Sequence, residues 1–333
     1  MKNIEGEFRD FIHSQLVILD AMLIEANEPV HGRPMRASML FVTECIVSIN
    51  DEEIDDDFLL QDYFGDILAV TTQWYRIRYG SELLKTPSDN IHGVVAAFGT
   101  PLSLQIPRIP EFGTPKTAVK RMVFADGVLD EENPMEWVTP APDFGDFKTE
   151  ATRALREDVT RVSSALRQVY RRILVADFSS SEERNLASSV EGHLEKSAAD
   201  IESSRYGAAV WEIHLCVEKI LKVFLRQTGA YVPHSHDVSK LVTAAEEAGL
   251  PSCGHLNLHQ LPPDGDAIRH RYEELPSPTF KEIMEIYDVA IHVTAHVAGA
   301  LKQSSFAENK EFYIKALPWH PKWKKNQSEN IDE

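Results

Sequence analysis

Residues 204–229 read SRYGAAVWEIHLCVEKILKVFLRQTG and have the apolar spacing of a buried α-helix. The apolar positions recur at intervals of three, four and seven, which places them on one helical face. Glu218 and Lys222 lie four residues apart on the more polar side, a spacing that favours a weak ion pair, and Gly229 is well placed to end the helix. We expect this face to lie in the core of a helical unit; it comprises Val210, Ile213, His214, Val217, Ile220, Leu221 and Phe224.

The segments around this helix are also helical in pattern. Residues 147–178 carry one apolar stripe, and residues 236–249 form an amphipathic segment that Asp237 can cap at its first turn. Residues 279–301 give a further helix of mixed apolar and polar character. We therefore expect an all-α bundle in the C-terminal part of the chain.

The N-terminal part has a different pattern. Residues 5–26 favour a helix, whereas residues 37–49 are compatible with either a helix or a strand. The acidic run at 50–57 is expected to begin a helix that ends near Gly80. Apolar runs on either side of Gly99-Thr100-Pro101 predict a β-hairpin. The expected fold class is thus an α+β domain followed by an all-α helical bundle.

The changes in pattern predict four regions. Prolines disfavour regular helices and strands in the segment before a domain edge that we expect near residue 145. The expected regions are an α+β domain at 1–145, a long connecting helix at 146–181, a helical bundle at 182–303 and a polar tail at 304–333.

Composition restricts the classes of function. The chain has 333 residues, of which 43% are hydrophobic, and no apolar run approaches the roughly 20 residues that a membrane helix needs. Its 34 basic and 52 acidic residues give a formal net charge of −18, which repels a polyanion and disfavours general nucleic-acid binding. The three cysteines are scattered and the N-terminus has no secretory pattern, so a reducing cytoplasm is expected. No cofactor motif is recognised, and we expect no cofactor.

Three stretches in order carry a family resemblance: AVWEIHLCVEKILKVFLRQTG, HDVSKLVTAAEEAG and IRHRYEELPSPTFKEIMEIYDVAIHVTAHVAGAL. Together they resemble HEPN (higher eukaryotes and prokaryotes nucleotide-binding) domains over about residues 182–303. The matching positions are Glu218, Lys219, Leu221, Lys222, His236, Asp237, Leu241, Arg271 and Tyr272. The resemblance implies an up-and-down bundle that often forms a homodimer. It also makes plausible a role in bacterial stress or phage defence, including toxin–antitoxin systems.

The resemblance also raises the question of ribonuclease activity. Many HEPN domains cleave RNA without metal, using an Arg followed four to six residues later by a His that acts as acid or base. Neither Arg269 nor Arg271 is followed by a His at that spacing. The resemblance therefore implies a non-catalytic protein that binds a nucleotide or a partner protein. The alternative is a cryptic metal-independent ribonuclease that uses Arg269, His270 and Arg271.

The same segment provides the candidate binding residues. If it holds an anion, the basic side chains should converge on one cleft; the candidates are Arg269, His270, Arg271, Lys219 and Lys222. The competing interpretation is structural, with Arg269 and His270 as the more accessible pair. In this structural interpretation, Arg271 bonds Glu218 and Tyr272 buries its ring. The residues with a structural role are then Glu218, Asp237 and Tyr272.

Other histidines suggest alternatives that we rank lower. Asp288, His292 and His296 are four residues apart on one helical face, a spacing compatible with zinc, although a solvent-exposed or dimer face is favoured. A second set of possible zinc ligands comprises His234, His236, Cys253, His255 and His259. Val289 and Val293 lie off the main apolar stripe of the last helix, which supports a homodimer through the bundle.

Overall fold

The computed structural model describes residues 6–49, 52–54, 57–84, 90–113, 119–140, 149–304 and 311–315. Its contacts divide the chain into two compact units. Unit 1 comprises Met1–Ser88, Phe112–Arg121 and Tyr313–Glu333, and unit 2 comprises Asp89–Glu111 and Met122–Phe312. Within the described ranges, no helix combines the length and the apolar character needed to cross a bilayer.

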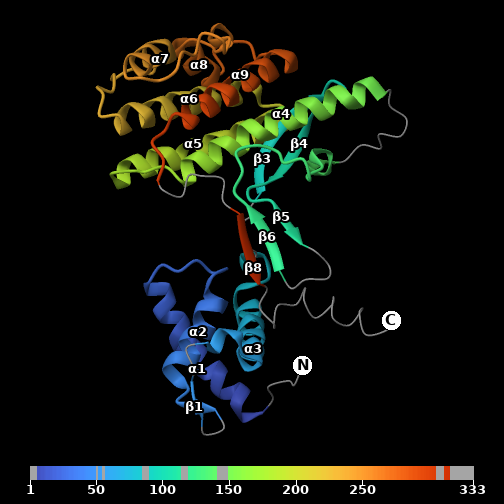
Figure 1. The fold of residues 1–333 in the computed structure, drawn as a ribbon, viewed down its shortest axis with the longest axis vertical. Helices are drawn as coiled ribbons and strands as arrows, with labels where there is room; N and C mark the ends of the chain where they lie inside the picture. Colours follow the sequence, from blue (N-terminus) through green and yellow to red (C-terminus); the bar gives the residue numbers. More distant parts are fainter. Residues whose placement is uncertain are drawn as a thin grey trace. The chain divides into compact units, whose positions relative to one another are not determined.

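Among its described residues, unit 1 has three helices (Figure 1) and a small antiparallel sheet of β1 and β2. The helices are α1 (Glu7–Glu25), α2 (Arg33–Cys45) and α3 (Asp62–Tyr79), with short turns η1 (Phe58–Leu60) and η2 (Glu82–Leu84) and strands β1 (Ser48–Ile49) and β2 (Glu52–Glu53). They enclose an apolar core that includes Ile12, Leu16, Phe41, Phe64 and Tyr75. The helix expected at 5–26 is confirmed, and the ambiguous run resolves into α2 and β1.

The acidic run does not begin a helix as expected. Glu52 and Glu53 form β2, which pairs with β1, and α3 begins only at Asp62. Favourable charges at a helix start stabilise a helix that packing supports, but they do not by themselves set where it begins.

Unit 2 begins with the expected hairpin. Strands β3 (Asn90–Ala97) and β4 (Thr100–Pro107) pair in antiparallel register, and Phe98 and Gly99 make the turn with φ of 54° and 75°. Positive φ at both turn residues suits the twist of a two-residue hairpin. Strand β7 (Val138–Thr139), which follows the short turn η3 (Pro134–Trp137), adds to the β4 edge.

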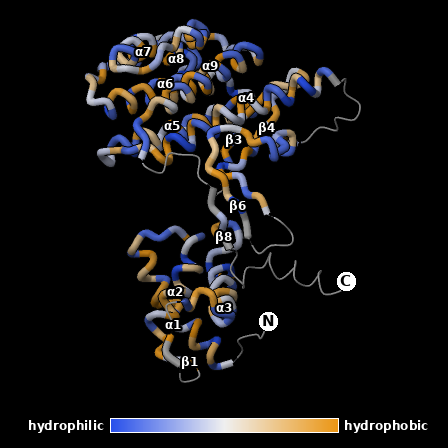
Figure 2. Tube along the Cα trace, in the orientation of Figure 1, coloured by the Kyte–Doolittle hydropathy of each residue, from blue (hydrophilic) through white to orange (hydrophobic). Residues whose placement is uncertain are grey.

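The rest of unit 2 is a helical bundle, as expected (Figure 1). Its elements are α4 (Thr149–Leu174), α5 (Ser181–Glu202), α6 (Tyr206–Gln227), α7 (Val238–Glu247), η5 (Leu258–Gln260), α8 (Asp264–Arg271) and α9 (Phe280–Gly299). Helix α6 contacts α5, α7, α8 and α9, so it is the central helix of the bundle. Hydrophobic and hydrophilic residues alternate in short runs along the helices, as in helices with one buried face (Figure 2). The predicted core is confirmed, because none of Ile213, Val217, Ile220 and Phe224 is more than 3% exposed.

Helix α4 is part of the core of unit 2, whereas the sequence predicted a helix that connects two domains. Its apolar face shares one core with the hairpin and the bundle. A Cβ atom on Gly93 of β3 would lie 2.4 Å from Leu166 Cδ1 of α4, so the hairpin packs on α4 too closely for a side chain there. The hairpin and α4 therefore both belong to unit 2, whereas the sequence places them in an N-terminal domain and a linker.

One other expected boundary falls on residues outside those described, as does most of the expected tail. The domain edge near residue 145 lies within the gap 141–148. Of the tail at 304–333, the structure describes only residue 304 and β8 (Glu311–Lys315), which forms a sheet with β5 (Glu111–Gly113) and β6 (Val119–Val123).

A buried arginine of α4 ties the hairpin and the segment after it to the bundle. Arg167 is 0% exposed and forms two hydrogen bonds with Glu132, of 2.6 and 2.9 Å. It also donates to the carbonyls of Pro107, at 3.1 Å, and Gly127, at 2.9 Å. Its guanidinium carbon lies 5.1 Å from the centre of the Trp137 ring.

Candidate functional site

Helix α8 carries the three consecutive basic residues on its last turn, where positive charge complements the helix dipole. It packs on the beginning of α6. A Cβ atom on Gly207 would lie 3.2 Å from the His270 carbonyl oxygen, so the two backbones approach closely here. The C-terminal end of α8 is therefore fixed against the first turns of α6.

Arg271 is an exposed side chain held by aromatic rings. Its guanidinium carbon lies 4.9 Å from the centre of the Trp211 ring on α6 and 5.6 Å from that of Tyr272. Within the described ranges it makes no ion pair, and the expected bond to Glu218 is wrong. A guanidinium stacked on aromatic faces keeps its charge and its hydrogen-bond donors available.

The other residues of the segment do not join Arg271 in one cleft. Arg269 has its own acidic neighbours, Asp266 at 3.5 Å and Glu274 at 4.0 Å. His270 is half-buried, and its Nδ1 is buried without a hydrogen bond to any described residue. Tyr272 is 64% exposed, so the expectation that it buries its ring is wrong. His270, not Tyr272, is the residue that packs against the bundle.

His214 continues the Trp211 stack along α6. The two rings are nearly parallel, with centres 6.1 Å apart. His214 Nε2 donates to the His236 carbonyl oxygen at 2.9 Å. Burial lowers the pKa of His214, although this hydrogen bond and nearby acids oppose the effect. The imidazole is therefore neutral at neutral pH and acts as a fixed donor.

Glu218 lies one turn further along the same face and organises the loop before α7. Its carboxylate accepts hydrogen bonds from Lys222, at 2.6 Å, and from His236 Nδ1, at 2.9 Å. Burial raises the pKa of Glu218, but the two bonds outweigh burial and the pKa lies below its usual value. His236 is 58% exposed, so Glu218 orients an imidazole that solvent can reach.

The two lysines therefore do not lie beside the stacked Arg271 guanidinium. Lys222 is engaged by Glu218. Lys219 is half-buried, and within the described ranges it has no acidic partner. At a rise of 1.5 Å per residue, Lys219 and Lys222 lie about 12 and 16 Å along α6 from Trp211. The five candidate cations are thus not gathered in one pocket.

Asp237 has the local arrangement expected of a cap. It stands at the N-cap of α7, and its carboxylate accepts from the amides of Ser239, at 3.0 Å, and Lys240, at 3.3 Å. It thereby fixes the start of the helix that follows His236.

The possible zinc ligands of α9 are engaged in other contacts. Asp288 pairs with Arg161 of α4, His292 Nδ1 lies 2.7 Å from the Asp288 carbonyl oxygen, and His296 Nε2 donates to the Pro251 carbonyl at 2.9 Å. Across the part of the chain that the structure describes, no group of three His, Cys, Asp or Glu side chains is arranged to hold a metal ion. This covers both sets of histidines, including Cys253, which is buried.

The sequence contained a signal for this polar face that its interpretation missed. Trp211, His214, Glu218 and Lys222 are spaced by three, four and four, which places them on one side of α6. The apolar spacing alone places His214 on the buried stripe. We name the part around the stacked arginine, formed by Trp211, Arg271 and Tyr272, the Arg271 surface.

Part of unit 2 matches a known family model. Residues 188–298, from within α5 to within α9, match the family model described as the HEPN domain. No curated protein and no solved structure matches the chain.

Proposed function

We propose that this chain, which carries a HEPN domain at residues 188–298, is a non-catalytic binding or regulatory protein. In this proposal the Arg271 surface holds an anionic group, which belongs to a nucleotide or to a partner protein. The observation that carries the proposal is the exposed Arg271 guanidinium, stacked on Trp211 and without a carboxylate partner among the described residues.

The chemistry of arginine supports an anionic ligand. Its planar donors match the oxygens of phosphate and carboxylate groups, and a side chain already held by stacking loses less freedom when it binds. The exposed Tyr272 ring offers an additional face for a flat ligand. The overall charge of −18 favours a short anion at one local cation over a long nucleic acid.

The surroundings of the histidines support binding without catalysis. A general acid or base must reach the proton that it transfers. His270 has its Nδ1 buried, and His214 is buried and already donates to a carbonyl.

The alternative function is a metal-independent ribonuclease based on Arg269, His270 and Arg271. One observation supports this alternative: His236 is an exposed imidazole that Glu218 orients. A cleavage test of the alternative should therefore include His236→Ala together with the α8 variants.

Calorimetric titration of the full chain with ADP tests the binding proposal. A hydrogen bond to a charged group contributes about 1.5–3 kcal/mol, so Arg271→Ala should weaken binding by roughly tenfold or more. Arg269→Ala is the matched control, because Arg269 lies on the same helix beside its own acidic neighbours; it should change the affinity by less than about threefold, as expected for a screened surface charge. If ADP does not bind, an acidic peptide titrated in the same way tests the partner-protein form. Equal effects of the two substitutions, or no binding of either ligand at millimolar concentration, would refute the proposal.

A homodimer through the bundle remains part of the proposal, since HEPN domains often dimerise. The two valines that suggested it do not support it, because Val289 is 7% and Val293 0% exposed within a single chain. Light scattering at micromolar concentration should give twice the chain mass of 37.6 kDa, and a monomer mass would remove the dimer.

We further propose a cytoplasmic role in bacterial stress or phage defence. The free cysteines Cys45, Cys216 and Cys253 suit a reducing compartment. If the role is defence, bacteria that express the chain should resist phage infection, and Arg271→Ala should abolish the resistance. Equal phage titres with and without the chain would contradict it.

A further inference from the structure

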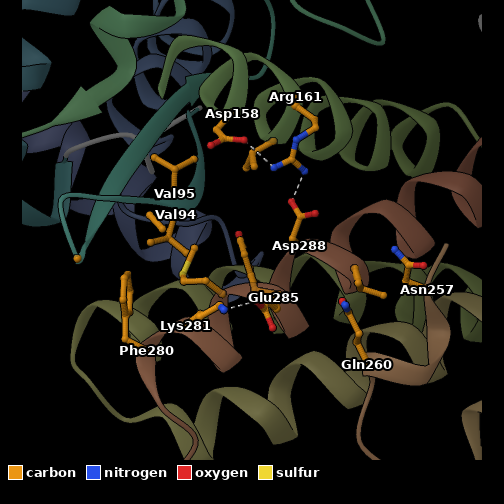
Figure 3. A pocket seen from close by; sticks show the side chains of 16 residues that line it. Val94, Val95, Asp158, Arg161, Asn257, Gln260, Phe280, Lys281, Glu285 and Asp288 are labelled. Carbon is orange, nitrogen blue, oxygen red and sulfur yellow. Dashed lines mark hydrogen bonds and ion pairs between the residues drawn. The ribbon is translucent and has the colours of Figure 1, made fainter. Parts of the chain in front are cut away.

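In unit 2, the hairpin, α4, α9 and η5 surround a pocket of about 540 Å³ (Figure 3). Its apolar wall includes the buried Val94 and Val95 of β3 and the half-buried Met284 of α9. Phe280, at the start of α9, adds an aromatic ring. A volume of this size falls within the roughly 300–1,000 Å³ of sites for small molecules.

The charged residues of the pocket leave it negative. Three carboxylates, Asp158, Glu285 and Asp288, line it together with two cations, Arg161 and Lys281, so one negative charge is left over. Arg161 is shared between two of the carboxylates: it bonds Asp158 at 3.0 Å and also pairs with Asp288 (Figure 3). Its charge is therefore not available to an anionic ligand.

Glu285 is the carboxylate best able to receive a ligand. Its only ion pair among the described residues is with Lys281 at 3.8 Å, and the two side chains are 49% and 85% exposed. Such exposed pairs contribute little, at most about 1 kcal/mol, so a better-placed cation can replace Lys281.

Two amide side chains complete the polar lining. Asn257 immediately precedes η5 and Gln260 is its last residue. Both lie on the opposite side of the pocket from Phe280 in this view (Figure 3). Their side-chain amides make no hydrogen bond to another described residue. An amide oxygen can accept a hydrogen bond from an ammonium or an N–H group.

We infer that this pocket binds a small organic cation, namely a primary amine carried on an aromatic ring. The ring lies against Phe280, Val94 and Met284, and the ammonium reaches Glu285. An apolar wall with a few polar groups suits such an amphipathic molecule, and the surplus negative charge repels phosphate and carboxylate ligands. The site shares no residue with the Arg271 surface, so it stands whether or not that surface binds an anion.

Calorimetric titration of the full chain with three indole compounds tests this inference. Tryptamine, indole-3-ethanol and indole-3-acetate carry the same ring with a charge of plus one, zero and minus one. The expected order of affinity is tryptamine, then the alcohol, then the acetate. Glu285→Gln should weaken tryptamine binding by about fivefold, the equivalent of roughly 1 kcal/mol, while the affinity for the alcohol stays within about twofold.

Glu247→Gln provides the matched control, because Glu247 is an exposed residue of α7 outside the pocket. This substitution should leave all three affinities unchanged. The inference is overturned if tryptamine does not bind at millimolar concentration, if it binds no better than indole-3-acetate, or if Glu285→Gln and Glu247→Gln have the same effect.

Discussion

Removing the Glu132 carboxylate should destabilise unit 2 more than any change at its surface. Glu132 supplies both oxygens that neutralise Arg167, whose side chain is 0% exposed. The Leu129 amide also donates to this carboxylate, at 2.8 Å. In Glu132→Ala the guanidinium stays buried without its counter-ion, and one backbone amide loses its acceptor.

The expected cost lies at the lower end of the range for a broken buried pair. Removing one partner of such a pair costs about 3–5 kcal/mol. Arg167 retains its bonds to the carbonyls of Pro107 and Gly127 and its contact with Trp137. We therefore expect a loss of about 3 kcal/mol in the free energy of unfolding.

Urea unfolding of the full chain, followed by far-UV circular dichroism, measures this loss. Arg153→Ala is the control on the same helix, because Arg153 is exposed and its acidic neighbours Glu150 and Glu157 are 3.8 and 3.9 Å away; it should cost less than about 1 kcal/mol. The double variant Arg167→Met/Glu132→Leu should recover part of the loss, since it leaves no unpaired charge. If Glu132→Ala costs no more than Arg153→Ala, Arg167 does not depend on this carboxylate and the reasoning fails.

Three further predictions concern the region that matches the HEPN family model. Phe224→Ala should lower the free energy of unfolding by about 3–5 kcal/mol, because the ring is buried in the core; an unchanged melting temperature would contradict its burial. Asp237→Ala should cost about 1 kcal/mol by removing the cap of α7, and equal denaturant midpoints would show that the cap contributes nothing. Burial lowers the pKa of His214, so on acidification the unfolded state takes up a proton before the folded state does. Stability should consequently fall as the pH drops below about 6.5, and His214→Gln should weaken this dependence in unfolding curves measured at several pH values; identical pH profiles would count against it.

Local patterns in the sequence were sufficient to predict most of the helices, the hairpin and the buried face of α6. The three- and four-residue spacing in α6 predicted the burial of Ile213, Val217 and Phe224, and the structure confirms it. The apolar runs around Gly99 predicted the hairpin, because few conformations can reverse a chain so sharply. Each of these features depends on residues that are near one another in the chain.

The partners of those faces could not be predicted, because they depend on residues far apart in the chain. The stripe on α4 shows that one face is buried but not that the hairpin covers it, so the helix was interpreted as a linker. Arg167 finds Glu132 only because the fold brings them together. A basic residue in an amphipathic helix otherwise resembles any solvent-exposed one.

The predicted contacts of the candidate site were partly wrong for a related reason. Charge alone suggested Glu218 as the partner of Arg271, but Lys222 and His236 already occupy that carboxylate. The actual partner is an aromatic ring, since Trp211 lies where α8 meets α6. Sequence spacing contains a signal for the polar face of α6 but none for which helix packs against its first turns.

Incubation of single-stranded RNA with the full chain in the presence of EDTA tests whether the protein lacks ribonuclease activity. No cleavage above that of a buffer blank is expected, and the same result is expected for Arg271→Ala, His270→Ala and His236→Ala. Cleavage by the unchanged chain that Arg271→Ala and one of the two histidine substitutions abolish would contradict the account and establish a ribonuclease.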